Sequence, residues 1–325
     1  MIKKLYILLM IACFVSCEKI DPIKEIKIDN QNLKSFLLAR YDKNKDGKIS
    51  EEEALDVVFI HLCCSQESID GLENFPNLEI LEVSSGEFTT LNVSKNFKLK
   101  ELDCSSGNLT VLDLSNNPNL IKLNCEYNKL ITLNVSNNAN LIELDCDYNK
   151  LTYLDVNNKP NLTKLSCAFN KLTTLDLHTC YNLKLLACSY NLLAELNLSN
   201  SYDLKEIFCT NNLLISIKIS ESTKLEDLIC SNNSQLSTLD LSKNIALSQL
   251  FCANTSITNL DVSNNIKLEN LICHSMNLET LDISNNLKLK YLHCNFNPNL
   301  HTLYMKTGQT LQTLNQDTHT TIVYL

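Results

Sequence analysis

Residues 120–130 read Leu-Ile-Lys-Leu-Asn-Cys-Glu-Tyr-Asn-Lys-Leu, and closely similar stretches return along most of the chain. Their cysteine recurs every 21 residues, with one inserted residue before Cys252. A fixed period of this length is typical of a solenoid, in which each coil buries its apolar face only against its neighbours. We therefore expect function on a long repeated surface. The cysteine ladder comprises Cys104, Cys125, Cys146, Cys167, Cys188, Cys209, Cys230, Cys252, Cys273 and Cys294.

Each coil contains two stretches in which apolar and polar residues alternate. In a strand over residues 123–125, Leu123 and Cys125 would point inward and Asn124 outward. Residues 151–156, Leu-Thr-Tyr-Leu-Asp-Val, alternate too and predict a second short strand on the opposite side of the coil. Most ladder cysteines are followed three residues later by an asparagine such as Asn128. We expect its amide to hydrogen-bond the backbone of adjacent turns.

The composition excludes several classes of protein. The formal net charge is −9 at pH 7, and the lysines are scattered among carboxylates without a basic run. A duplex-binding protein needs a basic stripe to displace counterions, so nucleic acid is not an expected partner. With five glycines among 325 residues, the chain is also neither collagen-like nor of low complexity.

The first residues have the pattern of an export signal. Lys3 and Lys4 precede an apolar segment, residues 5–15, that is too short for a transmembrane helix and fits a secretory signal peptide. The segment ends in Phe-Val-Ser-Cys at residues 14–17, which resembles a bacterial lipobox. This resemblance implies that Cys17 becomes the lipidated N-terminus, and lipid would then be the only membrane anchor. The alternative is an ordinary signal peptide in which Cys17 is incidental.

Residues 42–53, Asp-Lys-Asn-Lys-Asp-Gly-Lys-Ile-Ser-Glu-Glu-Glu, resemble the EF-hand calcium loop at every diagnostic position. Gly47 permits the sharp turn and Ile49 makes the short β contact. The resemblance implies Ca²⁺ bound by side-chain oxygens, one backbone carbonyl and a bidentate glutamate. The implied ligands are Asp42, Asn44, Asp46, the backbone of Lys48, Ser50 directly or through water, and Glu53.

The segments that flank this loop are predicted to be helical. Asp29 would cap a helix that presents Leu33, Phe36 and Leu37, and a second helix would run through residues 54–62 with Ala54, Val57, Val58 and Leu62 on it. No second loop is found, so a lone hand with three carboxylates should bind Ca²⁺ moderately. That suffices outside a cell, where dissociation constants of extracellular modules are about 10⁻⁴–10⁻³ M. A structural role is expected, and the alternative is an acidic turn that binds nothing.

The coils resemble leucine-rich repeats, whose core is LxxLxLxxNxL, with cysteine in the third apolar position. Together with the lipobox and the single calcium loop, they resemble Bacteroidetes-type bacterial leucine-rich-repeat surface lipoproteins. The resemblance implies an α/β leucine-rich-repeat solenoid of short parallel strands, exported and lipid-anchored in the outer membrane or at the cell surface. The predicted parts are a signal peptide (1–16), a lipid-anchored linker (17–28), an EF-hand-like helical cap (29–61), the repeats (62–305) and a β C-terminal cap (306–325).

The cysteine ladder is predicted to consist of free, buried thiols. Export favours disulfides, but parallel strands lie about 4.8 Å apart, whereas a disulfide needs Cβ atoms about 3.5–4.5 Å apart in a specific geometry. A line of sulfurs also gives no tetrahedral closure around a metal. The cysteines are therefore interpreted as small buried hydrophobes. No chemistry is assigned to Cys63, Cys64 or Cys180, the last of which replaces a turn asparagine.

Two outward stripes change character along the array. The residue before the ladder cysteine is polar or acidic in early coils and apolar later, and the residue two after it is aromatic in early coils. Contiguous exposed apolar surface usually marks an interaction site, although rings could instead shield the core or a loop could cover the strip. The apolar ribbon comprises Phe208, Ile229, Phe251 and Ile272, and the aromatic ladder comprises Tyr127, Tyr148, Phe169 and Tyr190.

Three classes of function follow from these features. The first is a recognition or adhesion module for a protein or peptide, and the second is a carbohydrate-binding surface built on the aromatic ladder. The third, an enzyme, is rejected because no Ser/His/Asp set, metal cluster or phosphate loop stands out. His274 and His293 lie in adjacent coils and could approach each other, which we interpret as a solvated pair.

Overall fold

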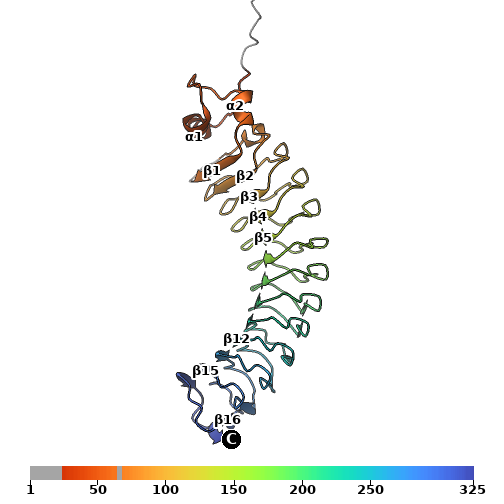
Figure 1. Ribbon diagram of the computed structural model, residues 1–325, viewed down its shortest axis with the longest axis vertical. Helices are drawn as coiled ribbons and strands as arrows, with labels where there is room; N and C mark the ends of the chain where they lie inside the picture. Colours follow the sequence, from red (N-terminus) through yellow and green to blue (C-terminus); the bar gives the residue numbers. More distant parts are fainter. Residues whose placement is uncertain (1–23, 64–67) are drawn as a thin grey trace, which may run out of the picture.

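The computed structural model of the protein describes residues 24–63 and 68–325. Over these residues the chain winds as a solenoid, with a small helical cap at its N-terminal end and stacked coils along the rest (Figure 1). The predicted solenoid architecture is confirmed. The predicted signal peptide, Cys17 and Cys64 lie outside the described residues.

One strand of each coil joins a thirteen-stranded parallel sheet. The central apolar residue of each strand pairs with its equivalent, as Leu102, Leu123 and Leu144 do. Because side chains alternate along a strand, this register keeps all the central residues on the core side. The strands of this main sheet are β1 (Phe59–Cys63), β2 (Ile80–Ser84), β3 (Glu101–Asp103), β4 (Lys122–Asn124), β5 (Glu143–Asp145), β6 (Lys164–Ser166), β7 (Leu185–Ala187), β9 (Glu206–Phe208), β11 (Asp227–Ile229), β12 (Gln249–Phe251), β13 (Asn270–Ile272), β15 (Tyr291–His293) and β17 (Thr313–Asn315).

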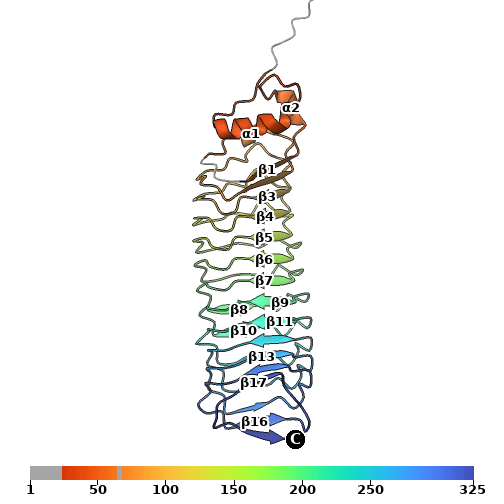
Figure 2. The same ribbon diagram turned by 90° about the vertical axis from the view of Figure 1, so that its left-hand side faces the viewer.

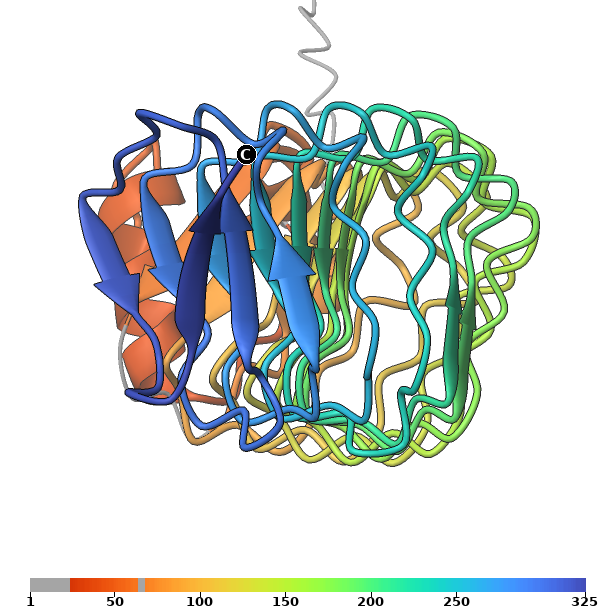
Figure 3. The same cartoon turned by 90° about the horizontal axis from the view of Figure 1, so that it is seen from below.

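The main sheet lies on the concave side of a gently bent solenoid, and the loops fan out on the convex side (Figure 1). Figure 2 views this sheet face-on, with its strands stacked one per coil. Figure 3 looks along the solenoid from its C-terminal end and shows β8 (Glu195–Asn197) and β10 (Ser216–Lys218) opposite the main sheet.

The second strand predicted in every coil forms in only a few of the described coils. β8 pairs with β10, and β14 (Thr280–Asp282), β16 (Thr302–Met305) and β18 (Thr321–Tyr324) form a small sheet at the C-terminal end. Residues 151–156 form no strand, although Leu154 and Val156 are buried as the alternation predicted. The loops fan out on the convex side (Figure 1), and strand pairing outside the main sheet is interrupted rather than continuous.

Leucines and cysteines fill the space between the two sides of each coil. The ten ladder cysteines are completely buried and their thiols are free, which confirms the prediction. Each cysteine follows directly after a three-residue strand rather than lying within it. Burial disfavours the thiolate and raises the pKa of Cys188 to about 12. Such thiols behave as inert packing groups rather than as nucleophiles.

The asparagine that stands three residues after seven of the ten ladder cysteines hydrogen-bonds the backbone of its own and the preceding coil, as predicted. The Asn149 amide nitrogen donates to the carbonyls of Cys125 (2.9 Å) and Cys146 (3.2 Å). Its amide oxygen accepts from the backbone N–H of Leu130 (3.0 Å). The same pattern recurs at Asn128, Asn170, Asn191, Asn212, Asn233 and Asn297.

The helical cap differs from the prediction in two respects. Helix α1 (Gln31–Tyr41) is capped by Asn30, whose side chain accepts from Leu33 N–H, and not by Asp29. Helix α2 (Glu51–Leu55) has one turn and does not extend through Val57 and Val58 to Leu62, because the chain enters β1 at Phe59. The apolar and β-branched residues at the start of β1 suit a strand better than a helix. β1 pairs with β2 in the main sheet. The sheet therefore begins slightly before the predicted boundary at residue 62.

The C-terminal tail forms strands, as predicted for a cap. β17 extends the main sheet and β18 pairs with β16. A short 3₁₀ helix, η1 (Leu72–Asn74), lies in the first coil. None of the helices within residues 24–63 and 68–325 is long and apolar enough to cross a membrane.

Candidate binding surface and calcium loop

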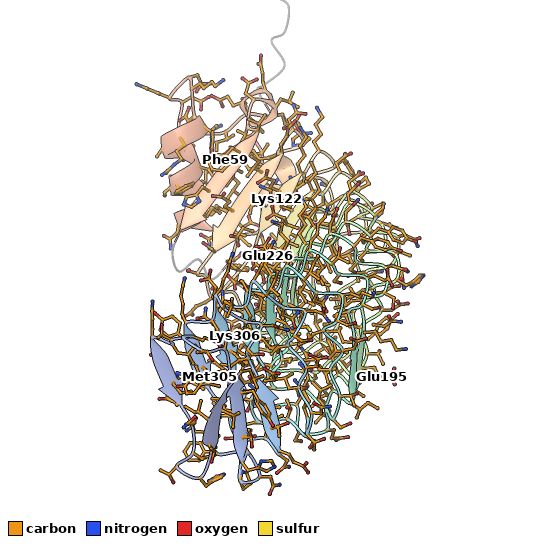
Figure 4. All side chains as sticks on the ribbon, turned by 60° about the horizontal axis from the view of Figure 1, so that its bottom comes forward. Phe59, Lys122, Glu195, Glu226, Met305 and Lys306 are labelled. Carbon is orange, nitrogen blue, oxygen red and sulfur yellow. The ribbon has the colours of Figure 1, made fainter. Side chains whose placement is uncertain are left out.

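The outward face of the main sheet carries side chains from every coil. Figure 4 places Phe59, Lys122 and Glu226 on the side of this sheet and Glu195 on the far side with β8. Each three-residue strand of the sheet has a single central core residue, so the residues on either side of it point to the concave surface. At the position before the ladder cysteine this surface is polar or acidic in β3 to β5 and apolar in β9 to β13, and the last strands, β15 and β17, carry His293 and Asn315 there.

The apolar ribbon lies on this face as predicted. Phe208 pairs with Ile229, Ile229 with Phe251, and Phe251 with Ile272, in adjacent strands β9, β11, β12 and β13. All four side chains are half-buried, whereas the central residues beside them, such as Ile207 and Leu228, are completely buried. The outward register is therefore confirmed. The four side chains shield one another and still leave a continuous apolar strip on the concave surface.

The aromatic ladder lies at the edge where the strands of the main sheet end. Its rings are stacked, with successive centroids 4.2, 4.0 and 4.1 Å apart and planes inclined by 12° or less. All four residues have left-handed backbones, with φ between 51° and 56°. That conformation costs about 1–2 kcal/mol per residue, and stacking contributes about 0.5–1.5 kcal/mol per pair. Asparagine tolerates the same backbone, which explains Asn211, Asn232 and Asn254 in the following coils.

A shallow hollow of about 220 Å³ lies on the charged half of the face, over β2 to β6. Asp103 and Asn124 are among the residues that line it, and the Asn124 amide donates to Asp103 at 3.3 Å. Lys122 is 3.8 Å from Glu101, which is a weak ion pair. The charged residues that line the hollow are Glu82, Glu101, Asp103, Lys122, Glu143, Asp145 and Lys164.

Carboxylates beside this hollow have raised pKa values. Burial, and then the neighbouring charge of Asp145, raise the pKa of Asp147 to about 6. Burial also raises the pKa of Asp145, and burial followed by repulsion from Asp145 raises that of Glu126. The Asp147 carboxylate accepts from Ala168 N–H at 2.5 Å. Burial and mutual repulsion disfavour the ionised form of these carboxylates, and a cation placed near them would stabilise that form.

The predicted calcium loop folds as a tight turn around its own carboxylates. Asp42 accepts from the N–H groups of Asp46 (3.2 Å) and Gly47 (2.9 Å), and Asn44 accepts from Asp46 N–H (2.9 Å). Gly47 has φ 83°, which the turn requires and glycine adopts readily. Oxygens of residues 42, 44 and 46 are therefore gathered on one side of the loop, and the donor set is the hard-oxygen set that Ca²⁺ prefers.

Glu53, the predicted bidentate ligand, is used differently in this structure. One carboxylate oxygen accepts from Lys43 N–H (2.8 Å) and Asn44 N–H (3.3 Å), and the other accepts from the N–H and hydroxyl of Ser50 (both 2.9 Å). These bonds lower the pKa of Glu53, with the backbone of Ser50 contributing most. No group of three or more His, Cys, Asp or Glu side chains is gathered around one point in the described part of the chain. The residues fit Ca²⁺ if Glu53 exchanges these donors for the ion.

The β contact of the predicted calcium loop is made with a segment that precedes helix α1. Glu25 and Ser50 form an antiparallel bridge, in which Ile26 N–H donates to Ile49 (2.9 Å) and Glu51 N–H donates to Lys24 (2.8 Å). EF-hand loops usually find this contact in a paired second loop, which the sequence lacks. Residues 24–26, which lie within the predicted linker (17–28), take that place beside the loop.

Cys180 occupies a buried position on the convex side that asparagine holds in most coils, as predicted. Asn117, Asn138, Asn244, Asn265 and Asn286 donate there to carbonyls of the preceding coil. Cys180 makes only a 3.6 Å contact from its thiol to the Val156 carbonyl, and burial raises its pKa to about 11. Lys159, in the coil before, is 1% exposed and donates to the Asn157 carbonyl at 3.4 Å. Neither residue gathers a catalytic partner.

Two apolar surfaces were not anticipated from the sequence. The residue after the buried convex-side position that holds asparagine, cysteine or serine is a large exposed apolar residue in six coils, and that recurrence was the signal of this exposed ridge in the sequence. The ridge includes Phe97, Tyr181, Tyr202, Ile245, Ile266 and Leu287. An apolar groove beneath the cap brings together Ile26, Leu55, Pro76 and Phe97, and only the fold could reveal it because these residues are distant in sequence.

His274 and His293 lie close together, as predicted. The pKa of His274 is lowered by burial and then by the nearby His293. His274 contacts the Ser275 hydroxyl (3.0 Å) and His293 contacts the Asn315 amide (3.3 Å). Both hydrogen-bond to neighbouring polar side chains, which is consistent with a solvated pair.

Comparisons with known proteins identify the fold. The chain matches no protein-family model and no curated protein sequence. It is similar to the functional domain of InlJ from Listeria monocytogenes, a domain that also includes a cysteine ladder. The two share 28% identity over 80% of this chain and 76% of that chain, with a TM-score of 0.53. The internalin InlF of the same organism shares 20% identity over 90% of this chain and 94% of that chain, with a TM-score of 0.76.

A plant structure is also similar to this chain. The leucine-rich-repeat ectodomain of the Arabidopsis thaliana receptor kinase GASSHO1/SCHENGEN3, solved in complex with Casparian strip integrity factor 2, has 23% identity, 72% of this chain and 34% of that chain covered, and a TM-score of 0.57. With the register, the parallel sheet and the 21-residue coils, these likenesses show that the chain has the leucine-rich-repeat solenoid fold.

Proposed function

We propose that this protein is a non-catalytic cell-envelope lipoprotein that binds a protein or peptide on the concave face of its main sheet, with a structural calcium site in its cap. The apolar ribbon carries this proposal. Four adjacent strands present Phe208, Ile229, Phe251 and Ile272 to solvent. Leaving apolar area in water is unfavourable by about 25 cal/mol per Å², so a strip of this kind is typical of an interaction site.

A protein or peptide fits the surface better than the alternative carbohydrate ligand. Sugar recognition by aromatic residues uses the faces of the rings, and in the aromatic ladder these faces are stacked on one another. Tyr127 and Tyr190 are each 48% exposed and offer edges and hydroxyl groups. A macromolecular ligand also agrees with the plant receptor ectodomain, which was solved in complex with Casparian strip integrity factor 2.

The double substitution Phe208→Ser/Phe251→Ser is expected to weaken partner binding or cell adhesion by at least about a hundredfold. A buried phenylalanine side chain contributes about 1.5–3 kcal/mol, and each 1.4 kcal/mol is about tenfold in affinity. The fold should be retained because neither ring lies in the core. Binding is measured by cell-adhesion and surface-plasmon assays, with the melting temperature as the check of folding. Val111→Ser, at a residue that is 68% exposed on another face, is the matched control.

Two outcomes would contradict this assignment. If the double variant folds and binds as the wild type does, the ribbon is not the site and the aromatic ladder becomes the next candidate. If Val111→Ser weakens binding equally, the effect is not specific to the concave face.

Anchoring is proposed from the lipobox-like sequence. Expression in a lipoprotein-processing bacterium should give a mature chain that begins at Cys17 and carries acyl groups, and Cys17→Ser should release it from the membrane fraction. Mass spectrometry of the N-terminal peptide makes the measurement. An unacylated chain cleaved at another position would contradict the anchor and leave the binding surface unaffected.

A further inference from the structure

The concave face has two halves of different chemistry that lie on one continuous sheet. Strands β9 to β13 carry the apolar ribbon, and strands β2 to β6 carry the hollow lined by carboxylates. In the described residues neither Asp145 nor Asp147 forms an ion pair within 4.0 Å. Glu126 and Asp147, which follow the strands, also belong to this half. Its carboxylates therefore outnumber its two lysines, Lys122 and Lys164.

The boundary between the halves is formed by small side chains. Ser166 and Ala168 are 5% and 6% exposed, and Ala187 lies beside Ser166 in the next strand. No large side chain therefore separates Asp145 from Phe208 along the row that joins them. Their strands are three apart in the sheet, β5 and β9, which corresponds to about 14 Å at about 4.8 Å per strand. An extended chain crosses this distance in about four residues.

A cationic side chain is the natural complement of the acidic half. Nucleic acid would be repelled by the same carboxylates. Guanidinium and ammonium groups on a flexible chain can reach separated carboxylates one at a time and form charge-assisted hydrogen bonds.

We infer that the partner presents a segment with a cationic end over β3 to β6 and an apolar end over β9 to β13, the two separated by about four residues. This inference rests on the proposed function, since it specifies the chemistry of the partner of the same face. The apolar end supplies most of the affinity, and the charged end fixes the position of the segment on the sheet and the choice of partner.

Three synthetic peptides test the inference with the full mature chain. The first joins an arginine pair to a Leu/Phe block through four Ser/Gly residues, the second replaces arginine with citrulline, which is isosteric and neutral, and the third has the arginine pair without the apolar block. The arginine–apolar peptide should bind about tenfold more tightly than the citrulline peptide, and the peptide without apolar residues should bind weakly. Binding is followed by fluorescence anisotropy.

Two pairs of substitutions separate the contributions of the charges and the ribbon. Asp145→Asn/Asp147→Asn should remove the preference for arginine over citrulline and leave citrulline-peptide affinity unchanged. The control Asp113→Asn/Asp240→Asn makes the same change in net charge at exposed positions outside this sheet and should leave the preference intact. Higher salt should weaken only the arginine peptides. Lowering the pH through about 6, where Asp147 is protonated, should do the same.

Equal binding of the arginine and citrulline peptides would overturn the inference, as would a preference that survives Asp145→Asn/Asp147→Asn. Failure of all three peptides to bind would overturn it too. None of these results would refute the proposed function, which depends on the natural partner and on the separate Phe208→Ser/Phe251→Ser variant. Loss of partner binding in that variant together with equal peptide binding would show that the ribbon is used without a cationic segment.

Discussion

Asn149→Ala is expected to lower the free energy of unfolding by about 2–4 kcal/mol, which is a large effect for a polar residue. The substitution leaves the Leu130 N–H without a partner, and the carbonyls of Cys125 and Cys146 each lose one of two amide donors, keeping those of Asn128 and Asn170. A buried backbone group left unpaired costs about 1–3 kcal/mol, and each hydrogen bond lost contributes about 0.5–1.5 kcal/mol. Partial entry of water keeps the total below the upper sum of these costs.

The matched control is Asn140→Ala in the same coil. The Asn140 amide donates to the Pro118 carbonyl at 3.1 Å, but this bond is exposed, and water can replace it. Its loss should change stability by less than about 1 kcal/mol. Guanidinium unfolding gives the global effect, and native-state hydrogen exchange at Leu130 gives the local one. Equal stability of the two variants would show that the buried asparagines are not needed to hold neighbouring coils together.

The repeat period carried nearly all the information needed for the solenoid. Leu123 and Cys125 point inward, and Phe208 points outward, because alternation within a strand and stacking between coils leave a single consistent register. The position of Asn128 followed from the need to satisfy buried backbone groups. Such local rules suffice where every coil repeats the same contacts with its neighbours.

Features that depend on contacts between unlike segments could not be predicted in this way. Gly107 stands where asparagine stands in the next coils, and the ring of Phe88 fills the space, so that an added Cβ at Gly107 would lie 2.7 Å from it. Helix α2 is short because the residues from Phe59 onward pair with β2 instead of continuing the helix, and this pairing is a contact between distant segments. Likewise, the aromatic ladder was expected as an exposed track, whereas the common left-handed backbone of its residues brings the rings face to face.

The candidate calcium site illustrates the same division. Spacing of oxygens identified Asp42, Asn44 and Asp46, and the structure holds these three in one hydrogen-bonded turn. The bridge from Glu25 to Ser50 had no signal in the sequence because it joins the loop to a segment outside the motif. The capping-box role of Glu53 was also hidden, although Ser50 and Glu53 stand at the spacing that such a box requires.

Calcium at a hundredfold excess over its dissociation constant is expected to stabilise the cap by about 2.7 kcal/mol, and Glu53→Gln should abolish this gain. Asp42 and Asn44 already lie in a turn that gathers their oxygens, so little ordering is needed. Glu53 must give up its bonds to Lys43, Asn44 and Ser50 to bind the ion. This competition predicts a moderate affinity, in the range of about 10⁻⁴–10⁻³ M of extracellular modules.

Glutamine suits this test because its amide oxygen can still accept the bonds from Ser50 that hold the capping box, and only the bonds from the Lys43 and Asn44 N–H groups to the other oxygen are lost. Glu52→Gln removes the same charge from the neighbouring exposed residue and should leave calcium binding unchanged. Calorimetric titration measures the affinity directly. Because a melt of the whole solenoid could hide a local change, hydrogen exchange at Ile26 and Glu51, whose amides form the bridge to the loop, gives the local stability.

Added calcium should slow exchange at both amides in the wild type and in Glu52→Gln, and should leave Glu53→Gln unchanged. The bridge joins Glu25, in the predicted linker, to Ser50 in the cap, so the same ion would stiffen the contact between that segment and the cap. A titration without heat, together with unchanged exchange at Ile26 in millimolar calcium, would contradict the site. The loop would then be an acidic turn that folds through its own hydrogen bonds, with Glu53 serving only to cap the backbone.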